Sequence, residues 1–192
     1  RTVLWHHFQM KLENIRLSEY LNSLQTEGQY CFSRKKIMEA MELTEIAFKK
    51  AISRLIRHGR VKRIYSDFYV LVPLEYKEAG VLPASWFIDD LMHYFQTSYY
   101  VGLRRAAALH GAAHQQPMAF QVISNQVINP IKSGRLRMEF YYKKIFDHSF
   151  SQPVKTETGT MQVSTPEMTA YDLVRYIDAA GQINNVATVL CE

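Results

Sequence analysis

Two helix start signals that lie close together in the sequence most constrain how this chain can fold. Ser33 stands before "RKKIMEAM" and Thr44 stands before "EIAFKKAISRLIR". Both residue types cap helix N-termini, and Gly59 follows the second segment as a typical helix terminator. The spacing therefore predicts two helices with a tight turn at Glu42–Leu43 between them, which is the helix-turn-helix pattern.

The residues after Gly59 predict a β-hairpin. The stretch "RVKRIYSDFYVLV" contains two runs of strand-forming residues joined by the turn residues Ser66–Asp67. A hairpin directly after a helix-turn-helix is a wing, so we expect a winged helix-turn-helix domain over residues 1–76. An additional N-terminal helix from Ser18 to Glu27, capped by Ser18, belongs to this domain. The leucines expected on its buried side are Leu17, Leu21 and Leu24.

A different pattern begins after residue 76. The segment "PLEYKEAGVLP" is bounded by prolines, and we interpret residues 77–83 as a linker. Residues 84–192 are predicted to form a mixed α/β domain, so the fold class of the chain is α+β: an N-terminal winged helix-turn-helix followed by a mixed α/β C-terminal domain. The predicted helices are "WFIDDLMHYFQ" capped by Ser85, "YYVGLRRAAALHGAA", and the segment from Thr165 to Gly181; the predicted strands are "MAFQVIS", "RLRMEFYYKKI" and "GTMQVS".

Composition narrows the class of protein. A chain of 192 residues with 47% hydrophobic content can bury a substantial core. The sequence contains neither an apolar run of the ~20 residues that a membrane span needs nor the apolar core of a signal peptide, so we expect a cytoplasmic protein. The spacing of Cys31 and Cys191 favours reduced thiols. From the start at Arg1 and the apolar end "NNVATVLCE" we expect that parts of the natural protein are missing from both ends, including the C-terminus of the second domain.

Positive charge is confined to the first part of the chain. Residues 1–76 contain 13 Lys and Arg against 8 Asp and Glu, whereas residues 77–192 contain 10 of each. Within residues 33–63 the count is 10 basic against 3 acidic. Such a local field attracts a polyanion, although a solvated helix face is also commonly charged. The combination of this charge with the predicted winged module favours binding to double-stranded DNA.

The predicted helix that begins at Thr44, the second of the helix-turn-helix, has a buried face and an exposed face. Its buried stripe is expected at Ala47, Phe48, Ala51, Ile52 and Leu55, because residues three and four apart share a helix face. Outward positions near the helix start would enter the major groove and read bases, and basic residues further away would contact phosphates. The predicted DNA-binding residues are Arg34, Lys35, Lys36, Thr44, Glu45, Lys49, Lys50, Ser53, Arg54, Arg57, Lys62 and Arg63.

Other candidate sites have simpler interpretations. His110 and His114 have the spacing of a metal pair, but a third ligand is not evident, and a packed or surface pair is the alternative. Asp89–Asp90 suit a solvated helix face. In Tyr99–Tyr100 and Tyr141–Tyr142 we expect one ring of each pair to pack inward, with base stacking as the alternative. The sequence contains no recognisable catalytic set, so we expect no enzyme activity, no metal and no cofactor.

Several motifs occur together in this chain. A Tyr-Tyr entry opens the alanine-rich "YYVGLRRAAALHG", a Gln-x-Pro precedes "MAFQVIS", and "STPEMTAYDLVRYID" contains an Asp-Leu that is expected to be buried. With the predicted winged helix-turn-helix, these motifs resemble those of the AbiEi antitoxins, a family of type IV toxin–antitoxin systems used in bacterial abortive infection. The similarity extends over roughly residues 17–190. Ser66–Asp67 depart from the Arg-Gly turn that is common in the wing of this family.

The resemblance implies a DNA-binding transcriptional repressor that is also an antitoxin. Its N-terminal domain would bind inverted repeats in its own promoter, as a dimer on DNA, and its domain over residues 84–192 would counter a nucleotidyltransferase-like toxin without a tight complex. No membrane contact is implied. Two alternatives stay open on the residues alone. One is a winged-helix module that binds an acidic protein partner, and the other is an enzyme with its site in residues 84–192.

Overall fold

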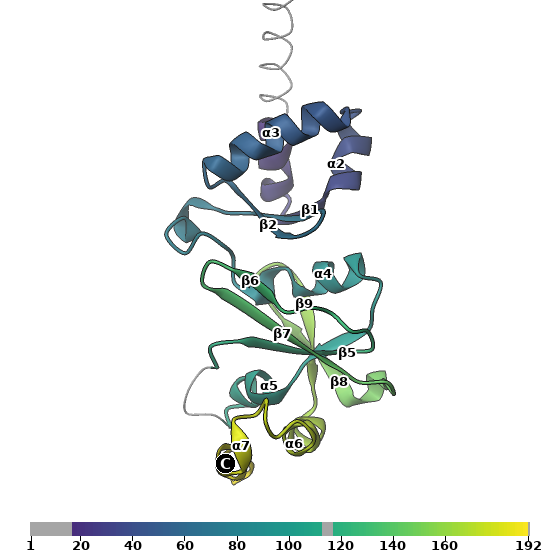
Figure 1. Cartoon of the computed structure of the whole chain (residues 1–192), viewed down its shortest axis with the longest axis vertical. Helices are drawn as coiled ribbons and strands as arrows, with labels where there is room; N and C mark the ends of the chain where they lie inside the picture. The colour runs from purple at the N-terminus through teal and green to yellow at the C-terminus, as the bar shows by residue number, and fades with distance from the viewer. Residues whose placement is uncertain (1–16, 113–116, 192) are drawn as a thin grey trace, which may run out of the picture. The chain divides into compact units, whose positions relative to one another are not determined.

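The protein consists of two compact units that meet in the sequence between Leu82 and Pro83. The structure is a computed structural model that describes residues 17–112 and 117–191 (Figure 1). Each unit contains its own β-sheet and its own buried hydrophobic cluster. The chain is therefore mixed α+β, as the sequence predicts.

The first unit combines short helices with a three-stranded antiparallel sheet. Residues 17–26 are helical, and the sheet has the strand order β1-β3-β2. The two helices and the β2–β3 hairpin occur at the positions that the sequence predicts. The elements are β1 (Cys31–Ser33), α2 (Arg34–Met41), α3 (Glu45–Arg57), β2 (Val61–Tyr65), β3 (Phe68–Leu71) and the short 3-10 helix η1 (Leu74–Tyr76).

Side-chain caps fix where α2 and α3 begin. The Ser33 hydroxyl accepts a hydrogen bond from the Lys36 N–H at 3.3 Å, and the Thr44 hydroxyl accepts one from the Ala47 N–H at 3.3 Å. Each bond satisfies one of the backbone donors that have no partner inside a helix. Between the helices Glu42 adopts the left-handed conformation with φ 51°, which ends α2. Local chemistry alone therefore sets the α2–turn–α3 spacing.

The core of the first unit surrounds Tyr69 on β3. Its ring stacks on Phe32 with centroids 5.5 Å apart and meets the edge of Phe48 from α3 at 5.9 Å. The three leucines of the first helix are buried, as predicted. The predicted cap at Ser18 is wrong, because Leu17 is already helical. The buried cluster comprises Leu17, Leu21, Leu24, Phe32, Ile37, Phe48, Ala51, Ile52, Val61, Tyr69 and Leu71.

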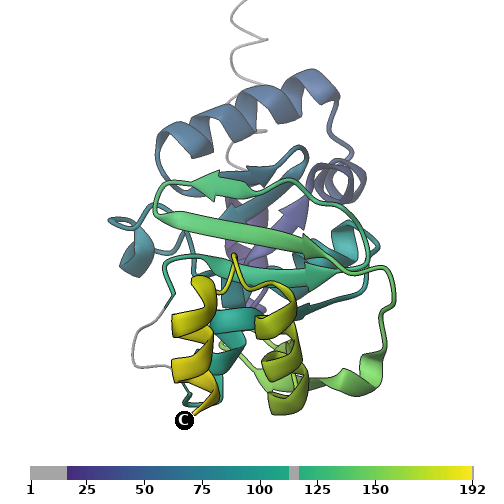
Figure 2. The same cartoon turned by 60° about the horizontal axis from the view of Figure 1, so that its bottom comes forward.

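The second unit is a six-stranded mixed sheet with helices on both sides. Strand order is β6-β7-β5-β4-β9-β8, with parallel pairing of β5 with β7 and of β4 with β9. In Figure 1, α5, α6 and α7 lie together on one side of this sheet and α4 lies on the other. The elements are η2 (Ala84–Trp86), α4 (Ile88–Tyr94), β4 (Tyr99–Val101), α5 (Leu103–Leu109), β5 (Phe120–Ser124), β6 (Ile131–Ser133), β7 (Leu136–Tyr142), η3 (His148–Phe150), β8 (Ser151–Lys155), β9 (Thr160–Ser164), α6 (Pro166–Arg175) and α7 (Gln182–Leu190). Figure 2 shows the three grouped helices from a second direction.

Strand β4 corrects the prediction of one helix over "YYVGLRRAAALHGAA". Its three residues are buried and pair with β5 on one side and β9 on the other. A short apolar run that is buried on both faces cannot be distinguished from a helical segment by its periodicity. Helix α5 starts only after Gly102, where a Cβ atom would lie 2.9 Å from Ile123 Cδ1. Glycine at this position lets the chain leave the central strand against β5.

Other boundaries also differ from the predictions. Ser85 lies within η2, and α4 begins after Phe87, so the predicted cap is wrong. Helix α6 ends at Arg175, and Gly181, in the left-handed conformation with φ 86°, precedes α7 instead of ending α6. The predicted elements do not include β6, β8 or α7. Strand β8 is an exposed edge strand with Pro153 in it, which is a weak strand signal.

No helix in the described part of the chain is long and apolar enough to cross a bilayer. Neither Cys31 nor Cys191, both of which the structure describes, takes part in a disulfide bond.

Candidate functional site

Helix α3 has one buried and one exposed face. Phe48, Ala51 and Ile52 are buried against the core, while Lys49, Lys50 and Ser53 are exposed. Since residues three, four and seven apart lie on one side of a helix, the exposed face collects the candidate base readers in a single stripe. The structure thus brings together the residues that the sequence places at the start of this helix.

All twelve predicted DNA-binding residues lie in the first unit at accessible positions. Arg34 and Lys62 are half-buried, and the others are exposed. Several of the basic side chains have polar neighbours: Lys35 lies 3.9 Å from Glu39, and Lys36 donates to Gln29 at 3.3 Å. These are surface contacts of low energy, so they leave both lysines able to contact a polyanion.

Arg34 has a different environment from the one expected of a phosphate contact. Its Nη2 atom lies 2.8 Å from Glu45 Oε1, and its Nη1 atom lies 3.6 Å from Asp67 Oδ1. Its backbone N–H also donates to the Asp67 carbonyl at 2.8 Å. Arg34 therefore connects the start of α2, the start of α3 and the turn of the β2–β3 hairpin. This role is not predictable from the sequence pattern, because it depends on contacts between residues far apart in the chain.

Glu45 is shared between two cations. Lys49 Nζ lies 2.8 Å from the same carboxylate that Arg34 contacts. The hydrogen bond from Lys49 and the positive charge of Arg34 hold the pKa of the Glu45 carboxyl below its usual value. Glu45 is thus an ionised acceptor at neutral pH, while the cluster of these three residues carries net positive charge.

Ile46 is an apolar residue on the face of α3 that is otherwise polar. Its side chain is 68% exposed although it is a large aliphatic group. Ile46 stands three and four residues before Lys49 and Lys50, and therefore lies beside them on the exposed stripe. Ile46 is not among the predicted DNA-binding residues, which are all polar or charged.

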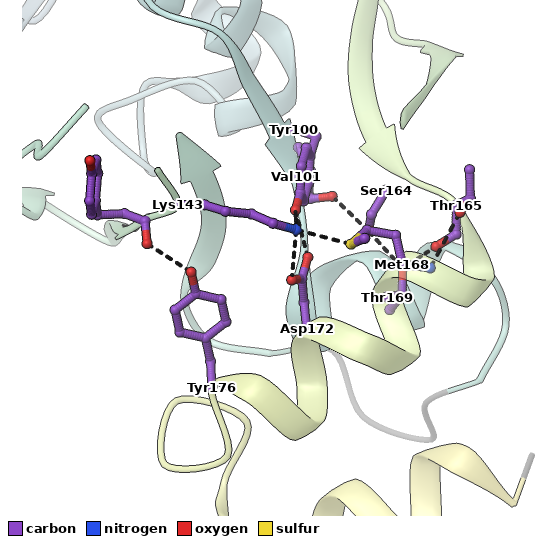
Figure 3. A network of polar contacts seen from close by, with 10 residues as sticks. Tyr100, Val101, Lys143, Ser164, Thr165, Met168, Thr169, Asp172 and Tyr176 are labelled. Carbon is purple, nitrogen blue, oxygen red and sulfur yellow. Dashed lines mark hydrogen bonds and ion pairs between the residues drawn. The ribbon is translucent and has the colours of Figure 1, made fainter. Parts of the chain in front are cut away.

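The second unit contains a buried polar network around Asp172 (Figure 3). The Tyr100 hydroxyl donates to Asp172 Oδ2 at 2.7 Å, and Lys143 Nζ lies 3.1 Å from Asp172 Oδ1 and 2.8 Å from the Tyr100 oxygen. The Asp172 side chain is fully buried and the Lys143 side chain is 10% exposed. Burial and the hydrogen bond to Asp172 raise the pKa of Tyr100, so its hydroxyl stays protonated as a donor.

This network connects three separate segments of the chain. Tyr100 belongs to the central strand β4, Lys143 follows β7 directly, and Asp172 belongs to α6. The resemblance implied that Asp172 and Leu173 are buried, and they are 0% and 1% exposed. Lys143 is not among the predicted site residues, because "YYKKI" has the appearance of a strand that ends in solvated lysines.

A second buried contact fixes the first turn of α6. The Ser164 and Thr169 hydroxyl oxygens lie 2.6 Å apart, and Thr169 also donates to the Thr165 carbonyl at 2.8 Å. The Thr165 hydroxyl accepts from the Met168 N–H at 3.3 Å, as expected for the predicted cap. These contacts hold α6 against the end of β9.

The remaining sequence candidates have structural roles where the structure describes them. His110 directly follows α5, and its Nε2 lies 2.8 Å from the Ser164 carbonyl oxygen at the end of β9. His114 lies outside the described residues. Across residues 17–112 and 117–191, no group of three or more His, Cys, Asp and Glu side chains could hold a metal ion. Asp89 accepts a hydrogen bond from the Tyr99 hydroxyl at 2.9 Å.

The tyrosine pairs follow the prediction in one case. Tyr142 is 48% exposed and Tyr141 is partly buried, as expected of a pair with one inward ring. For Tyr99 and Tyr100 the prediction is wrong, because both are buried. β4 lies in the middle of the sheet and both of its faces are covered.

Removing the Asp172 carboxylate tests the importance of the buried network. We expect Asp172→Ala to lower the free energy of unfolding by about 3 kcal/mol, because it leaves the Lys143 ammonium buried without its counter-charge. Urea denaturation followed by circular dichroism measures this change. The matched control is Asp178→Ala, which removes an exposed carboxylate from the same unit. Equal urea midpoints for the two variants would show that the network contributes nothing to stability.

Comparison with known proteins finds a match to a family model in the region that contains this network. A family model described as the AbiEi antitoxin C-terminal domain matches residues 100–192. No curated protein matches the chain. The matched region begins at Tyr100 and includes Lys143 and Asp172, so all three members of the buried network lie within it.

Proposed function

We propose that this chain is the antitoxin of a type IV toxin–antitoxin system and that it also represses its own operon. The match of residues 100–192 to a family model described as the AbiEi antitoxin C-terminal domain supports the antitoxin role. An antitoxin implies a toxin partner. We propose that this toxin is nucleotidyltransferase-like and that the chain counters its effect without a tight complex. The antitoxin-type domain would comprise residues 84–192, joined by a linker at 77–83 to a DNA-binding domain at 1–76.

The observation that carries the repressor proposal is the exposed face of α3. Helices α2 and α3 follow each other through a short turn, and the β2–β3 hairpin comes directly afterwards. We interpret this arrangement as a winged helix-turn-helix. In such modules the second helix enters the major groove through its first turns, where Glu45, Lys49, Lys50 and Ser53 are exposed. Basic residues release counterions from DNA phosphates when they bind.

The roles of the other residues follow from their positions. Lys35, Lys36 and Arg57 are exposed on α2 and α3, and Lys62 and Arg63 belong to β2. We propose that these five contact phosphates and set the register of the protein on operator DNA. Arg34 is proposed to act as a positioning residue that orients α3 and the hairpin turn. Binding to inverted repeats requires two copies related by a two-fold axis, so a dimer on DNA is part of the proposal.

A non-enzymatic, cytoplasmic repressor and antitoxin is consistent with this assignment of residues. The main alternative is a module whose basic face binds an acidic protein. Excess nonspecific DNA distinguishes the two, because it competes for a nucleic-acid face and leaves a specific protein complex in place. The exposed stripe of α3 favours DNA, since its cations are accompanied by short polar groups suited to base edges, such as Ser53.

Titration of the full chain on its own upstream DNA at several salt concentrations tests the repressor proposal. We expect the affinity to fall steeply with salt, with a logarithmic slope of about −0.9 for each phosphate neutralised. The variant Lys49→Ala/Lys50→Ala should weaken binding by at least about tenfold, which is the lower range for the loss of good base contacts. Electrophoretic mobility shift or fluorescence anisotropy provides the measurement.

The matched control for that variant is Lys132→Ala/Lys155→Ala, which removes two exposed lysines from β6 and β8 of the second unit. This control should retain the wild-type affinity and slope. Affinity that is undetectable at low salt, or that does not respond to salt, would contradict the repressor proposal. Equal weakening in the two double variants would instead contradict the placement of the reading face.

The exposed Ile46 side chain leads to a separate prediction about base recognition. An aliphatic group at the start of a recognition helix can contact the C5-methyl group of thymine in the major groove. Replacing operator thymines one at a time by deoxyuridine removes only that methyl group. We expect one such replacement to weaken binding of the wild type about threefold or more and to leave Ile46→Ala unaffected. If the two proteins respond equally at every position, Ile46 does not contact a methyl group.

Co-expression tests the antitoxin proposal. A toxin encoded beside this chain should arrest growth when expressed alone, and the full chain should restore growth. Because we propose no tight complex, the toxin should not co-purify with the tagged chain from the same cells. The Lys49→Ala/Lys50→Ala variant supplies the control and should still restore growth from a plasmid promoter. A chain that fails to restore growth at matched expression would refute the antitoxin role and leave the repressor role intact.

A further inference from the structure

A pocket of about 470 Å³ opens in the second unit beside the buried network. Tyr100, Lys143 and Met168 line it together with residues that follow β7 and residues of α6. A volume of this size is typical of sites for small organic ligands. The twelve residues predicted to bind DNA all lie in the first unit, so this pocket is not part of that interface.

The network leaves the pocket with cations at its accessible positions. Lys143 Nζ donates hydrogen bonds to the Tyr100 hydroxyl oxygen at 2.8 Å, to the Asp172 carboxylate at 3.1 Å and to the Met168 sulfur at 3.0 Å. Asp172 thereby neutralises Lys143. The other two cations of the lining, Lys144 and Arg175, are both exposed.

One carboxylate opposes these cations. Asp147 also lines the pocket, and the Ser149 backbone N–H donates to it at 2.8 Å. That hydrogen bond holds the pKa of the Asp147 carboxyl below its usual value, so the group is ionised at neutral pH. With Lys143 and Asp172 cancelling, Lys144 and Arg175 outweigh Asp147 by one positive charge. An anionic group is therefore the favoured polar part of a ligand.

The rest of the lining is aromatic and apolar. Tyr171 is 55% exposed and Phe150 is 45% exposed, although each could bury a large area against a partner. The Lys143 ammonium lies 5.6 Å from the Tyr171 ring centroid, so this ring stands next to a cation in the pocket lining. Aromatic rings beside cations are the combination that stacks on a planar base and binds its phosphate.

We propose that this pocket binds a nucleoside phosphate. The base would lie against Tyr171 and Phe150, and the phosphate would be held by Lys144 and Arg175. Arginine suits this role because its planar guanidinium can donate two parallel hydrogen bonds to a phosphate group. The site lies in the region of the family match, and all of its lining residues belong to the second unit.

Calorimetric titration of the full chain with adenosine and guanosine 5′-monophosphates tests the site. We expect at least one nucleotide to bind at least tenfold more tightly than its own nucleoside, which lacks the phosphate, and than ribose 5-phosphate, which lacks the base. Absence of binding by both nucleotides at millimolar concentration would overturn the proposal. Equal affinity of nucleotide and nucleoside would also overturn it, because the cations would then have no part in binding.

Three variants test the site by the direction in which each changes the affinity for the nucleotide. Arg175→Ala and Lys144→Ala should each weaken nucleotide binding about fivefold or more, while Asp147→Asn should strengthen it about twofold or more because it removes a repelling charge. Arg137→Ala, an exposed cation on β7 outside the lining, is the matched control and should leave affinity unchanged. All four positions are exposed, and circular dichroism confirms folding. Weaker binding in Asp147→Asn, or an equal loss in Arg137→Ala, would refute the assignment.

Discussion

The ion pair between Asp172 and Lys143 is the interaction on which the second unit most depends. It joins α6 to the end of β7, and the Tyr100 hydroxyl extends it to the central strand β4. A fully buried carboxylate is tolerated only where such partners replace its water. The pair therefore specifies one arrangement of α6 over the sheet: a helix shifted by one turn would bury Asp172 without a counter-charge. The apolar packing of Leu173 in the hydrophobic core of the second unit is less directional, so by itself it would tolerate such a shift more easily.

The same network also sets the chemistry of the pocket beside it. Since Lys143 is neutralised by Asp172 and bonded to Tyr100, the pocket floor is polar without being strongly charged. The charge that a ligand meets then comes from Lys144 and Arg175, which are exposed and can adjust to it. Stability and recognition are thus separated within the second unit, because different cations serve them. Substitution of the exposed cations can change binding at little expense to the fold.

Local chemistry explains which parts of the fold were predictable from the sequence. Ser33, Thr44 and Thr165 cap helices through bonds to residues three positions away, so the starts of α2, α3 and α6 follow from short segments. Strand β4 was mistaken for helix because its burial depends on β5 and β9. The bridging role of Arg34 and the pairing of Lys143 with Asp172 likewise depend on contacts across the chain. Periodicity contains no information about such contacts.

The contrast between the two units in how they use lysine and arginine supports separate roles for them. Residues 1–76 contain 13 basic against 8 acidic residues, and the basic side chains of α2, α3 and β2 lie at exposed or half-buried positions, where counterion release can drive binding to a polyanion. In residues 77–192 the 10 basic and 10 acidic residues balance, and Lys143 is buried in a contact with Asp172. A balanced surface attracts DNA weakly. For the second unit, a local pocket with placed charges, such as the one lined by Lys144 and Arg175, is therefore a better candidate binding site than an extended surface for a polyanion.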